Sequence, residues 1–115
     1  MGKGTVQHMV TPGEIKRYCA AIARAFEPEK IILFGSHAHG RPHRDSDVDV
    51  LVVMPDAKRY GRRPSLTIRR EVHAGFPVDI LVKEPREIAE RLSEGDSLLE
   101  EIVNRGRLMY EAGGR

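Results

Sequence analysis

The amino-acid sequence predicts a single α/β domain in which helices pack on a small sheet. Segments with a helical spacing of apolar residues alternate with short β-branched runs, which is typical of layered α/β folds. The 115 residues, 40% hydrophobic and 31% charged, suffice for one core. We expect loose residues at 1–10, the folded domain over 11–110 and a flexible tail at 111–115.

The N-terminal half is expected to fold as helix, strand, turn and strand. A capping-box spacing begins a helix at Thr11, and apolar residues continue at helical spacing to about Phe26. An apolar, β-branched run then predicts a buried strand over Lys30–Phe34. The Gly, Pro and His residues of 35–46 indicate a turn, and Asp47–Met54 is the most strand-like segment of the chain.

The C-terminal half predicts one more strand and three helices. A helix is expected to begin near Pro64, and Phe76–Val82 to form the third strand. Pro85 begins a further helix, and Ser97–Arg105 forms the last one. Four apolar residues of that last helix are expected to face the core: Leu98, Leu99, Ile102 and Val103. Leu108–Tyr110 is either a last edge strand or a tucked tail.

Composition and charge narrow the function. The 19 Lys and Arg residues nearly balance the 17 Asp and Glu residues, so the net charge of +2 gives no bulk attraction to nucleic acid. Cys19 is the single cysteine, which excludes an intrachain disulfide. No apolar run is long enough to span a membrane, and residues 1–10 lack the apolar segment of a secretory signal. We therefore expect a cytoplasmic protein without a membrane partner.

Two aspartates interrupt the most apolar strand. Asp47 and Asp49 stand two positions apart, so in a strand their carboxylates share one face while the neighbouring valines pack on the other. Buried carboxylates need a cation or hydrogen-bond donors, which favours a metal pair over two solvated acids at the start of a strand. Asp79 is the lone charge in Phe76–Val82, and the alternative for it is a salt-bridged core acid.

If the two strands are neighbours, the three aspartates form an oxygen-rich site. Such a site suits Mg²⁺, with Mn²⁺ as the alternative, and does not suit Zn²⁺. These ions stabilise in-line phosphoryl displacement. Gly35 and Ser36 directly follow the first strand, where free backbone N–H groups and a hydroxyl suit a phosphate. A Walker-type phosphate loop is disfavoured, because Arg41 and Pro42 stand where Lys and Ser or Thr are required.

The spacing of these candidate residues is similar to that of a known superfamily. Gly35-Ser36, then Asp47-Val48-Asp49 after ten intervening residues, and Asp79 in a Val-Asp-Ile strand resemble the polymerase-β-type nucleotidyltransferases, especially their minimal MNT branch. The resemblance covers about residues 15–83, and 102–110 also resembles the usual MNT ending. It implies a mixed sheet flanked by helices and metal-dependent transfer of a nucleoside monophosphate from a nucleoside triphosphate, with release of pyrophosphate.

The resemblance also implies roles for individual residues and a partner. Gly35 and Ser36 would hold the triphosphate, Asp47 and Asp49 would bind the metals, and Asp79 would complete the metal site and favour deprotonation of the acceptor hydroxyl. MNT proteins are commonly encoded beside HEPN proteins, which are small helical RNases, and act as antitoxins that transfer AMP to them. The resemblance therefore implies ATP as donor and a HEPN-type partner, and it leaves a homo-oligomer open.

The phosphate turn departs from the pattern of that branch. Members often carry Arg or Tyr between the Ser and the Gly of the turn, where this chain has His37 and His39. Neutral imidazole compensates phosphate charge poorly, so Arg41 and Arg44 are the candidate substitutes. A transition-metal site at His37, His39 and His43 is the weaker alternative, since their spacing matches no standard zinc pattern.

The remaining alternatives concern the partner of the domain. A basic stretch at Lys58–Arg70 is either a solvated face or a contact for phosphates or an acidic partner. It contains only Tyr60 as an aromatic residue, and the C-terminal third is acidic, which disfavours a nucleic-acid tailing enzyme. The main alternative to catalysis is a binding module of the same fold that neutralises its partner by contact alone. Three acids in apolar strands favour catalysis over that alternative.

Overall fold

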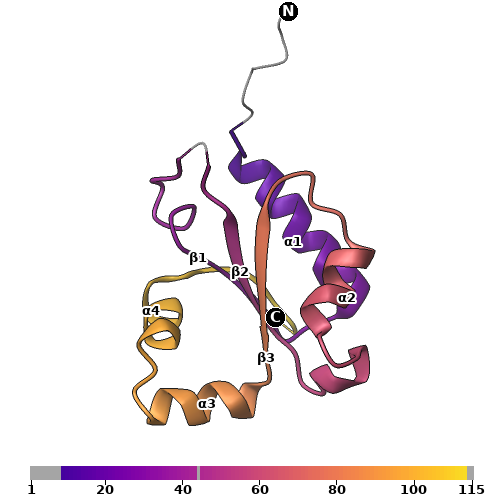
Figure 1. The fold of residues 1–115 in the computed structure, drawn as a ribbon, viewed down its shortest axis with the longest axis vertical. Coiled ribbons are helices and arrows are strands. Elements are labelled where there is room, and N and C mark those ends of the chain that lie inside the picture. Colours follow the sequence, from indigo (N-terminus) through magenta and orange to yellow (C-terminus); the bar gives the residue numbers. More distant parts are fainter. Residues whose placement is uncertain (1–8, 44, 114–115) are drawn as a thin grey trace, which may run out of the picture.

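The computed structural model describes residues 9–43 and 45–113, which form helices on both sides of one sheet (Figure 1). In chain order the elements are α1 (Pro12–Phe26), β1 (Lys30–Phe34), β2 (Val48–Val53), the 3-10 helix η1 (Ala57–Tyr60), α2 (Pro64–Glu71), β3 (Val78–Lys83), α3 (Pro85–Ser93), α4 (Ser97–Arg105) and β4 (Arg107–Glu111).

The strands form a mixed sheet in the order β3-β2-β1-β4. β1 pairs antiparallel with both β2 and β4, whereas β2 and β3 run parallel. α1 and α2 lie on one face of the sheet and α3 and α4 on the other; we name these the α1/α2 face and the α3/α4 face (Figure 1). The expected α/β domain with a mixed sheet flanked by helices is confirmed.

Alternation along the strands divides the hydrophobic core between the two faces. On β2, Val48, Val50 and Val52 pack on the α1/α2 face, while Leu51 and Val53 pack on the other. The α1/α2 core is the larger one. The smaller core on the α3/α4 face consists of Leu51, Val53, Leu99 and Ile102. Every apolar residue of β2 is therefore buried, and only Asp49 interrupts the pattern.

α1 begins and ends as the sequence predicts. The N–H of Glu14 donates to the Thr11 hydroxyl at 3.1 Å, and the N–H of Thr11 donates to the Glu14 carboxylate at 2.9 Å. This reciprocal capping box satisfies backbone N–H groups that the start of a helix leaves without an intrahelical partner. Glu27 ends the helix in the left-handed region at a φ of 48°, and Pro28 prevents its continuation.

Two strands begin later than their apolar patterns predict. β2 begins at Val48 and not at Asp47, and β3 begins at Val78 and not at Phe76. The N–H of Val48 donates to the carbonyl of Pro77 at 3.0 Å, which is the first bond of the ladder between the two strands. Pro77 has no N–H to extend that ladder backwards, so pairing stops there. Asp47 consequently lies outside the sheet.

The predicted inward face of α4 is partly wrong. Leu99 and Ile102 are buried as expected, but Leu98 and Val103 are 51% and 48% exposed. At 100° per residue these two side chains lie on either side of the buried pair. The contact between α4 and the sheet buries only the central stripe of the apolar face, so the positions on either side of that stripe stay at the surface.

The C-terminal segment is an edge strand, one of the two predicted alternatives. β4 continues to Glu111, and the N–H of Ala112 donates to the carbonyl of Glu29 at 2.9 Å, so the expected tail at 111–115 is wrong for these two residues. Val10 packs against the core, although 1–10 were expected to be loose. Residues 1–8 and 114–115 lie outside the described part of the chain. In the part that is described, no helix has the length and apolar character to cross a membrane.

Candidate active site

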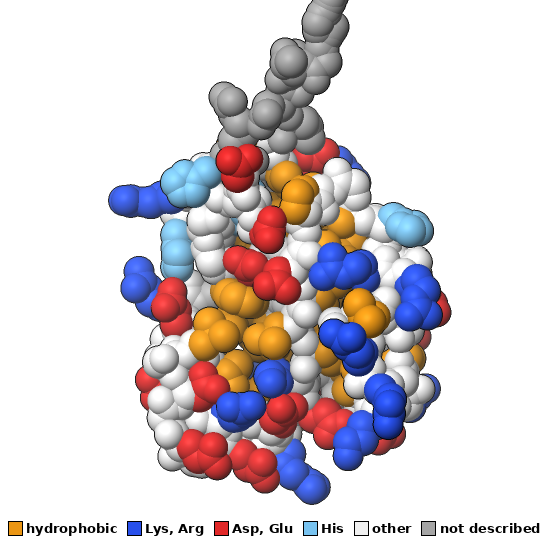
Figure 2. All heavy atoms as spheres, in the orientation of Figure 1, with side chains coloured by type: hydrophobic (Ala, Val, Ile, Leu, Met, Phe, Trp, Pro, Cys, Tyr) orange, Lys and Arg blue, Asp and Glu red, His pale blue; other side chains and the backbone are white. Residues whose placement is uncertain are grey.

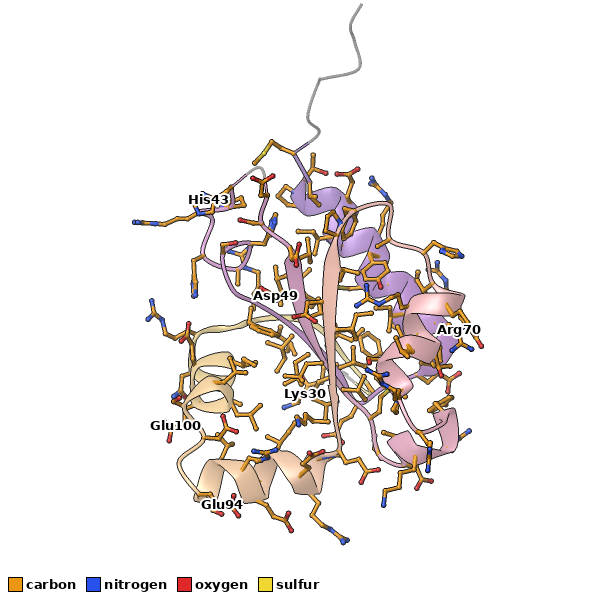
Figure 3. All side chains as sticks on the ribbon, viewed as in Figure 1. Lys30, His43, Asp49, Arg70, Glu94 and Glu100 are labelled. Atoms are coloured by element: carbon orange, nitrogen blue, oxygen red, sulfur yellow. The ribbon has the colours of Figure 1, made fainter. Side chains whose placement is uncertain are left out.

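The parallel pairing of β2 and β3 places two of the predicted aspartates side by side. Asp49 and Asp79 are register partners, and both lie on the α3/α4 face, opposite to Val48 and Val78. Asp47 lies two residues earlier, just before β2. Figure 3 shows Asp49 on β2, toward the end of the sheet where the 35–47 connection lies. The structure therefore brings the three predicted carboxylates to one end of the sheet.

The carboxylates are more exposed than their apolar neighbours predict. Asp49 is half-buried, whereas Asp47 and Asp79 are exposed. Asp47 precedes its strand and β3 is an edge strand, so neither carboxylate is enclosed. The prediction that burial makes these acids depend on a cation is therefore wrong for Asp47 and Asp79. Only Asp49 is held in a partly dehydrated position.

Gly35 fixes the position of the Asp49 carboxylate. It has a φ of +78°, and a Cβ atom built on it would collide with Asp49 Oδ2. The carbonyl of Gly35 accepts a hydrogen bond from the N–H of Ala38 at 3.0 Å, and Ala38 is buried in the core. The turn after β1 is thus packed directly against the carboxylate. The sequence predicted a glycine for close approach of a phosphate, and the structure shows that a carboxylate also needs it.

The pKa of Asp49 is raised above its ordinary value. Burial is the largest cause, because it penalises the charged form, and repulsion from the Asp79 and Asp47 carboxylates adds to it. The His37 ring opposes these effects and lowers the pKa. Asp49 thus experiences both neighbouring acids, and a cation among the three would relieve the dehydration and the repulsion together.

The donor chemistry of the three acids fits Mg²⁺ or Mn²⁺. All their ligand atoms are oxygens, which these ions prefer. In the described residues, no group of three or more His, Cys, Asp or Glu side chains is arranged to hold a metal ion. The exposed side chains of Asp47 and Asp79 have room to rotate toward a cation on Asp49. The acids are therefore a candidate ligand set and not a preformed cage.

The other predicted site residues belong to the connection between β1 and β2. Ser36 is half-buried directly after Gly35, and its carbonyl accepts a hydrogen bond from the N–H of Arg41 at 3.0 Å. The Arg41 side chain is exposed, so a phosphate at the turn can reach it. Arg44, the second predicted cationic substitute, lies outside the described residues.

The turn histidines point to different partners and do not form a transition-metal site. His37 Nε2 lies 3.4 Å from the carbonyl oxygen of Ser46, and His39 Nε2 lies 3.8 Å from Glu101 Oε2 on α4. Within the described part of the chain, no metal-holding group includes them. The effect of His37 on Asp49 was not predicted, because the sequence separation between the two gives no sign of how the connection folds back.

Sequence reasoning also missed an apolar surface beside the acids. Phe34 is the antiparallel partner of Asp49, and Leu81 follows Asp79 by two residues on the same face. Both side chains pack against the smaller core. Figure 2 shows acidic side chains directly above an exposed apolar patch. This neighbour could have been found from the sequence: if the predicted strands Lys30–Phe34 and Asp47–Met54 are paired as an antiparallel hairpin, the last residue of the first strand lies opposite Asp49.

The acids lie at an open surface. The main cavities of the described residues are lined by side chains other than the three aspartates. One of these cavities is an apolar groove of about 340 Å³ between the sheet and the helices α3 and α4, and Ile32, Ile88 and Val103 are among its lining residues. In the described part of the chain, Asp47 and Asp79 are exposed to solvent and Asp49 is half-buried. A substrate bound there would leave one side free for another molecule.

The fold and the arrangement of these residues define a class of protein. The chain has a mixed sheet with helices on both faces, a Gly-Ser turn after β1 and an Asp-x-Asp motif at the start of β2. Together these features are the arrangement of a nucleotidyltransferase domain. The family model of the nucleotidyltransferase domain matches residues 15–109, and the chain belongs to that family.

Comparison with solved structures agrees with this assignment. The chain is similar to a protein from Sulfolobus solfataricus whose crystal structure is described as that of a candidate nucleotidyltransferase. The TM-score is 0.57 and the identity 20%, with 87% of this chain and 79% of that chain covered. At this identity the likeness shows the fold alone. The search of curated proteins finds no match. The MNT branch and its HEPN partner therefore stay predictions.

Proposed function

We propose that this chain is an MNT-type enzyme that transfers AMP from ATP to a hydroxyl group of a partner protein, and that the partner is a helical HEPN-type protein. The observation that carries the proposal is the contact of Gly35 with the Asp49 carboxylate, with Asp79 in register beside it. Nucleotidyl transfer needs a phosphate-binding turn and a cluster of acids next to each other, and this contact joins the two.

In this proposal the turn binds the triphosphate and the acids act at its α-phosphate. Free backbone N–H groups and the Ser36 hydroxyl would donate hydrogen bonds to phosphate oxygens, and Arg41 and Arg44 would compensate their charge. The three aspartates would hold Mg²⁺, or Mn²⁺ in its place. When bound, the ion supplies positive charge that stabilises the charge developing on the phosphate oxygens.

The transfer exchanges a phosphoanhydride for a phosphoester bond. The oxygen of the acceptor hydroxyl attacks the α-phosphorus of ATP, the bond from that phosphorus to the bridging oxygen breaks, and pyrophosphate leaves. The hydroxyl proton passes to the Asp79 carboxylate, which is exposed and lies beside Asp49, and from there to solvent. The products are the AMP-modified acceptor and pyrophosphate.

A protein acceptor suits the open site. Since the Asp47 and Asp79 carboxylates are exposed, this chain offers the acceptor little enclosure, and the acceptor needs a surface of its own. Residues 84–105, which include α3 and α4, hold seven Asp and Glu residues against three Arg residues, and this excess of negative charge would repel the phosphates of a nucleic-acid acceptor.

A non-catalytic binding module of the same fold is the second candidate. The exposure of Asp47 and Asp79 favours it, because solvated carboxylates are stable without a cation. The contact between Gly35 and Asp49 favours catalysis, because a module that acts by contact alone has no use for a turn held in the left-handed region against a half-buried acid.

Label transfer distinguishes the two candidates. The protein is incubated with α-labelled ATP, Mg²⁺ and the product of the adjacent gene, and label is measured on the partner. We expect Asp47→Asn to lower transfer about 100-fold or more. Asp56→Asn is the matched control: it removes the same charge from an exposed residue outside the site, where a φ of 61° also suits Asn. No transfer by the wild type, or equal transfer by Asp47→Asn, overturns the proposal in favour of the binding module.

A further inference from the structure

β3 is an edge strand with an unpaired outer side. Its partner in the sheet is β2. The N–H of Val48 donates to Pro77, and the N–H of Met54 donates to Lys83, both at 3.0 Å. In a parallel ladder, these two bonds direct the odd-numbered residues of β3 toward β2. The N–H and C=O groups of the even-numbered residues therefore point away from the sheet; these residues are Val78, Ile80 and Val82. Within the described residues, none of those groups bonds to another element.

The outer side of β3 also reaches the surface. Figure 1 shows β3 in front of β2, with α1 and α2 to one side and α3 and α4 to the other, so the view of Figure 2 looks onto the β3 edge. White atoms, the colour of the backbone and of the remaining side chains, form a vertical column there, between acidic and apolar side chains on the left and Lys and Arg side chains on the right (Figure 2). The edge is therefore accessible to another chain.

A strand added antiparallel to β3 would bring one of its side chains against Asp79. Since Asp79 directs its own backbone groups toward β2, it takes a non-hydrogen-bonded position relative to the added strand. Cα atoms of such a pair lie about 4.5 Å apart, and their side chains share a face. A residue opposite Asp79 would thus present its side chain on the α3/α4 face, beside both Asp79 and Asp49.

Basic side chains flank the same edge on the other face. Arginines in α2 and just before it are exposed, and none forms an ion pair with a carboxylate in the part of the chain that is described: these are Arg62, Arg63, Arg69 and Arg70. Figure 3 shows Arg70 on α2. α2 packs on the α1/α2 face next to β3. In the added strand, the two residues that flank the one opposite Asp79 would project their side chains toward this face. Acidic residues at those two positions would complement the arginines.

We propose that the β3 edge binds the acceptor as an extended polypeptide segment, antiparallel to β3, with a Ser, Thr or Tyr hydroxyl opposite Asp79 and acidic residues on either side of it. The role as acceptor rests on the proposed function, whereas the pairing itself does not. Hydrogen bonds to the backbone of β3 supply affinity, and the alternation of side chains between an acidic site and a basic flank supplies specificity.

Peptide binding in the absence of ATP tests the pairing. The probe is the fluorescein-labelled peptide Glu-Val-Glu-Tyr-Glu-Val-Glu, and binding is measured by fluorescence anisotropy. N-methylation of the glutamate that faces Ile80 removes a hydrogen bond to β3 and is expected to weaken binding about tenfold. N-methylation of the central tyrosine, whose N–H points away from β3, is the matched control and is expected to leave affinity unchanged.

Variants of β3 test the same contact from the protein side. Val82→Pro removes an N–H that points outward and keeps the bonds to β2, and Val82→Ala keeps the N–H. We expect the Pro variant to weaken peptide binding about tenfold relative to the Ala variant. A far-ultraviolet spectrum and a thermal unfolding curve for each variant show that both are folded. A probe with lysine in place of glutamate is expected to bind more weakly than the glutamate probe, because it repels the α2 arginines.

Transfer of label from α-labelled ATP then separates this proposal from the proposed function. Binding of the glutamate peptide with no transfer to its tyrosine supports the pairing and contradicts the enzymatic function. Transfer to a partner protein that is equally fast in Val82→Pro and Val82→Ala supports the function and overturns the pairing. Equal binding of the two N-methylated peptides, or of the glutamate and lysine probes, also overturns the proposal as stated. Transfer to a nucleic acid in preference to peptide or protein would overturn the choice of a polypeptide acceptor.

Discussion

At Gly35, two requirements meet in a single residue. Its φ of +78° is a conformation that glycine adopts freely, and the space where a Cβ would stand is filled by the Asp49 carboxylate. The turn and the acid are therefore positioned by each other. The sequence indicates a turn at this glycine, but the contact depends on how the connection folds back onto β2, which no local pattern describes.

Gly35→Ala is predicted to damage the site more than the fold. The left-handed conformation costs about 1–2 kcal/mol with a Cβ, and the collision moves the Asp49 carboxylate, so we expect nucleotide transfer to fall about 100-fold. Gly40→Ala is the control, because Gly40 has a φ of +71° and nothing within 4 Å of its Cβ position. Urea unfolding and label transfer are measured for both. Equal loss of transfer in the two variants would contradict the role of Gly35.

Asp49→Asn is predicted to stabilise the protein when no divalent cation is present. The raised pKa means that the folded state holds the Asp49 proton more tightly than the unfolded chain does. The ionised carboxylate therefore destabilises the fold, and this contribution appears as the pH rises from the ordinary value of 3.8 through the raised value. Solvent screens the half-exposed group, so we expect a gain of at most about 1 kcal/mol at pH 7.

Urea unfolding in EDTA at pH 7 and at pH 3 checks this prediction. The variant is expected to be more stable than the wild type at pH 7, and the difference is expected to vanish at the lower pH, where both side chains are neutral. Mg²⁺ is expected to narrow the difference at pH 7 by stabilising only the wild type. A variant that is less stable than the wild type in EDTA at pH 7 would contradict the electrostatic interpretation.

Among the elements, α4 shows what periodicity does and does not determine. The sequence predicts the helix and its bounds correctly, and it predicts four inward residues, of which only Leu99 and Ile102 are buried. Apolar spacing defines a stripe, but the width of the stripe that becomes covered depends on the neighbouring elements. Leu98 and Val103 lie on the margins of that stripe, and nothing in the described structure covers them.

Alanine substitutions in α4 measure this difference. Leu99 is 1% exposed and packs in the smaller core, so Leu99→Ala is expected to cost about 2–5 kcal/mol of unfolding free energy. Leu98 is its neighbour and 51% exposed, so Leu98→Ala is expected to change stability by no more than about 0.5 kcal/mol. Both variants remove the same atoms, and urea unfolding compares them. Similar losses would show that Leu98 is buried by a contact outside the described residues.

The strands show the same limit of sequence-based prediction. The run Lys30–Phe34 gives the bounds of β1 directly, because Pro28 and Gly35 interrupt regular structure on either side. The apolar pattern that includes Asp47 gives too early a start for β2, because pairing depends on the partner strand and begins only at Val48. The exposure of Asp47 follows from that pairing. The face of the sheet on which Asp49 lies was predictable from the alternation of side chains along the strand. Which residues stand beside Asp49 could be predicted only with knowledge of the strand order.

For the whole molecule, the near-neutral net charge conceals two surfaces of opposite sign. Arginines gather on and before α2, whereas over residues 84–105, which include α3 and α4, seven Asp and Glu residues outnumber three Arg residues. The sheet separates these groups, and the β3 edge runs between them (Figure 2). The net charge of +2 therefore predicts little about binding, whereas the position of each charge relative to the sheet predicts which partners the two sides attract.

Cys19 offers a reporter of global unfolding. It is 1% exposed between α1 and the sheet, and burial raises the pKa of its thiol to about 11, so about one thiol in a thousand is ionised at pH 8. We expect the thiol reagent DTNB to react with the native protein only through the small population of opened molecules, and to react at once in urea. Leu99→Ala is expected to speed labelling about tenfold for each 1.4 kcal/mol of stability that it loses, because the opened population rises by that factor. Rapid labelling of the native wild type would contradict the burial of Cys19.

The hairpin of β1 and β2 has a consequence for the order in which the molecule folds. These strands are adjacent in the chain and joined by 35–47, whereas β3 reaches β2 only after the crossover through η1 and α2. Closing the shorter loop carries the smaller entropic cost, which favours formation of the hairpin before the parallel pairing. In that order Gly35 and Asp49 meet before Asp79 arrives, and the carboxylate repulsion in the site is imposed only when β3 joins the sheet.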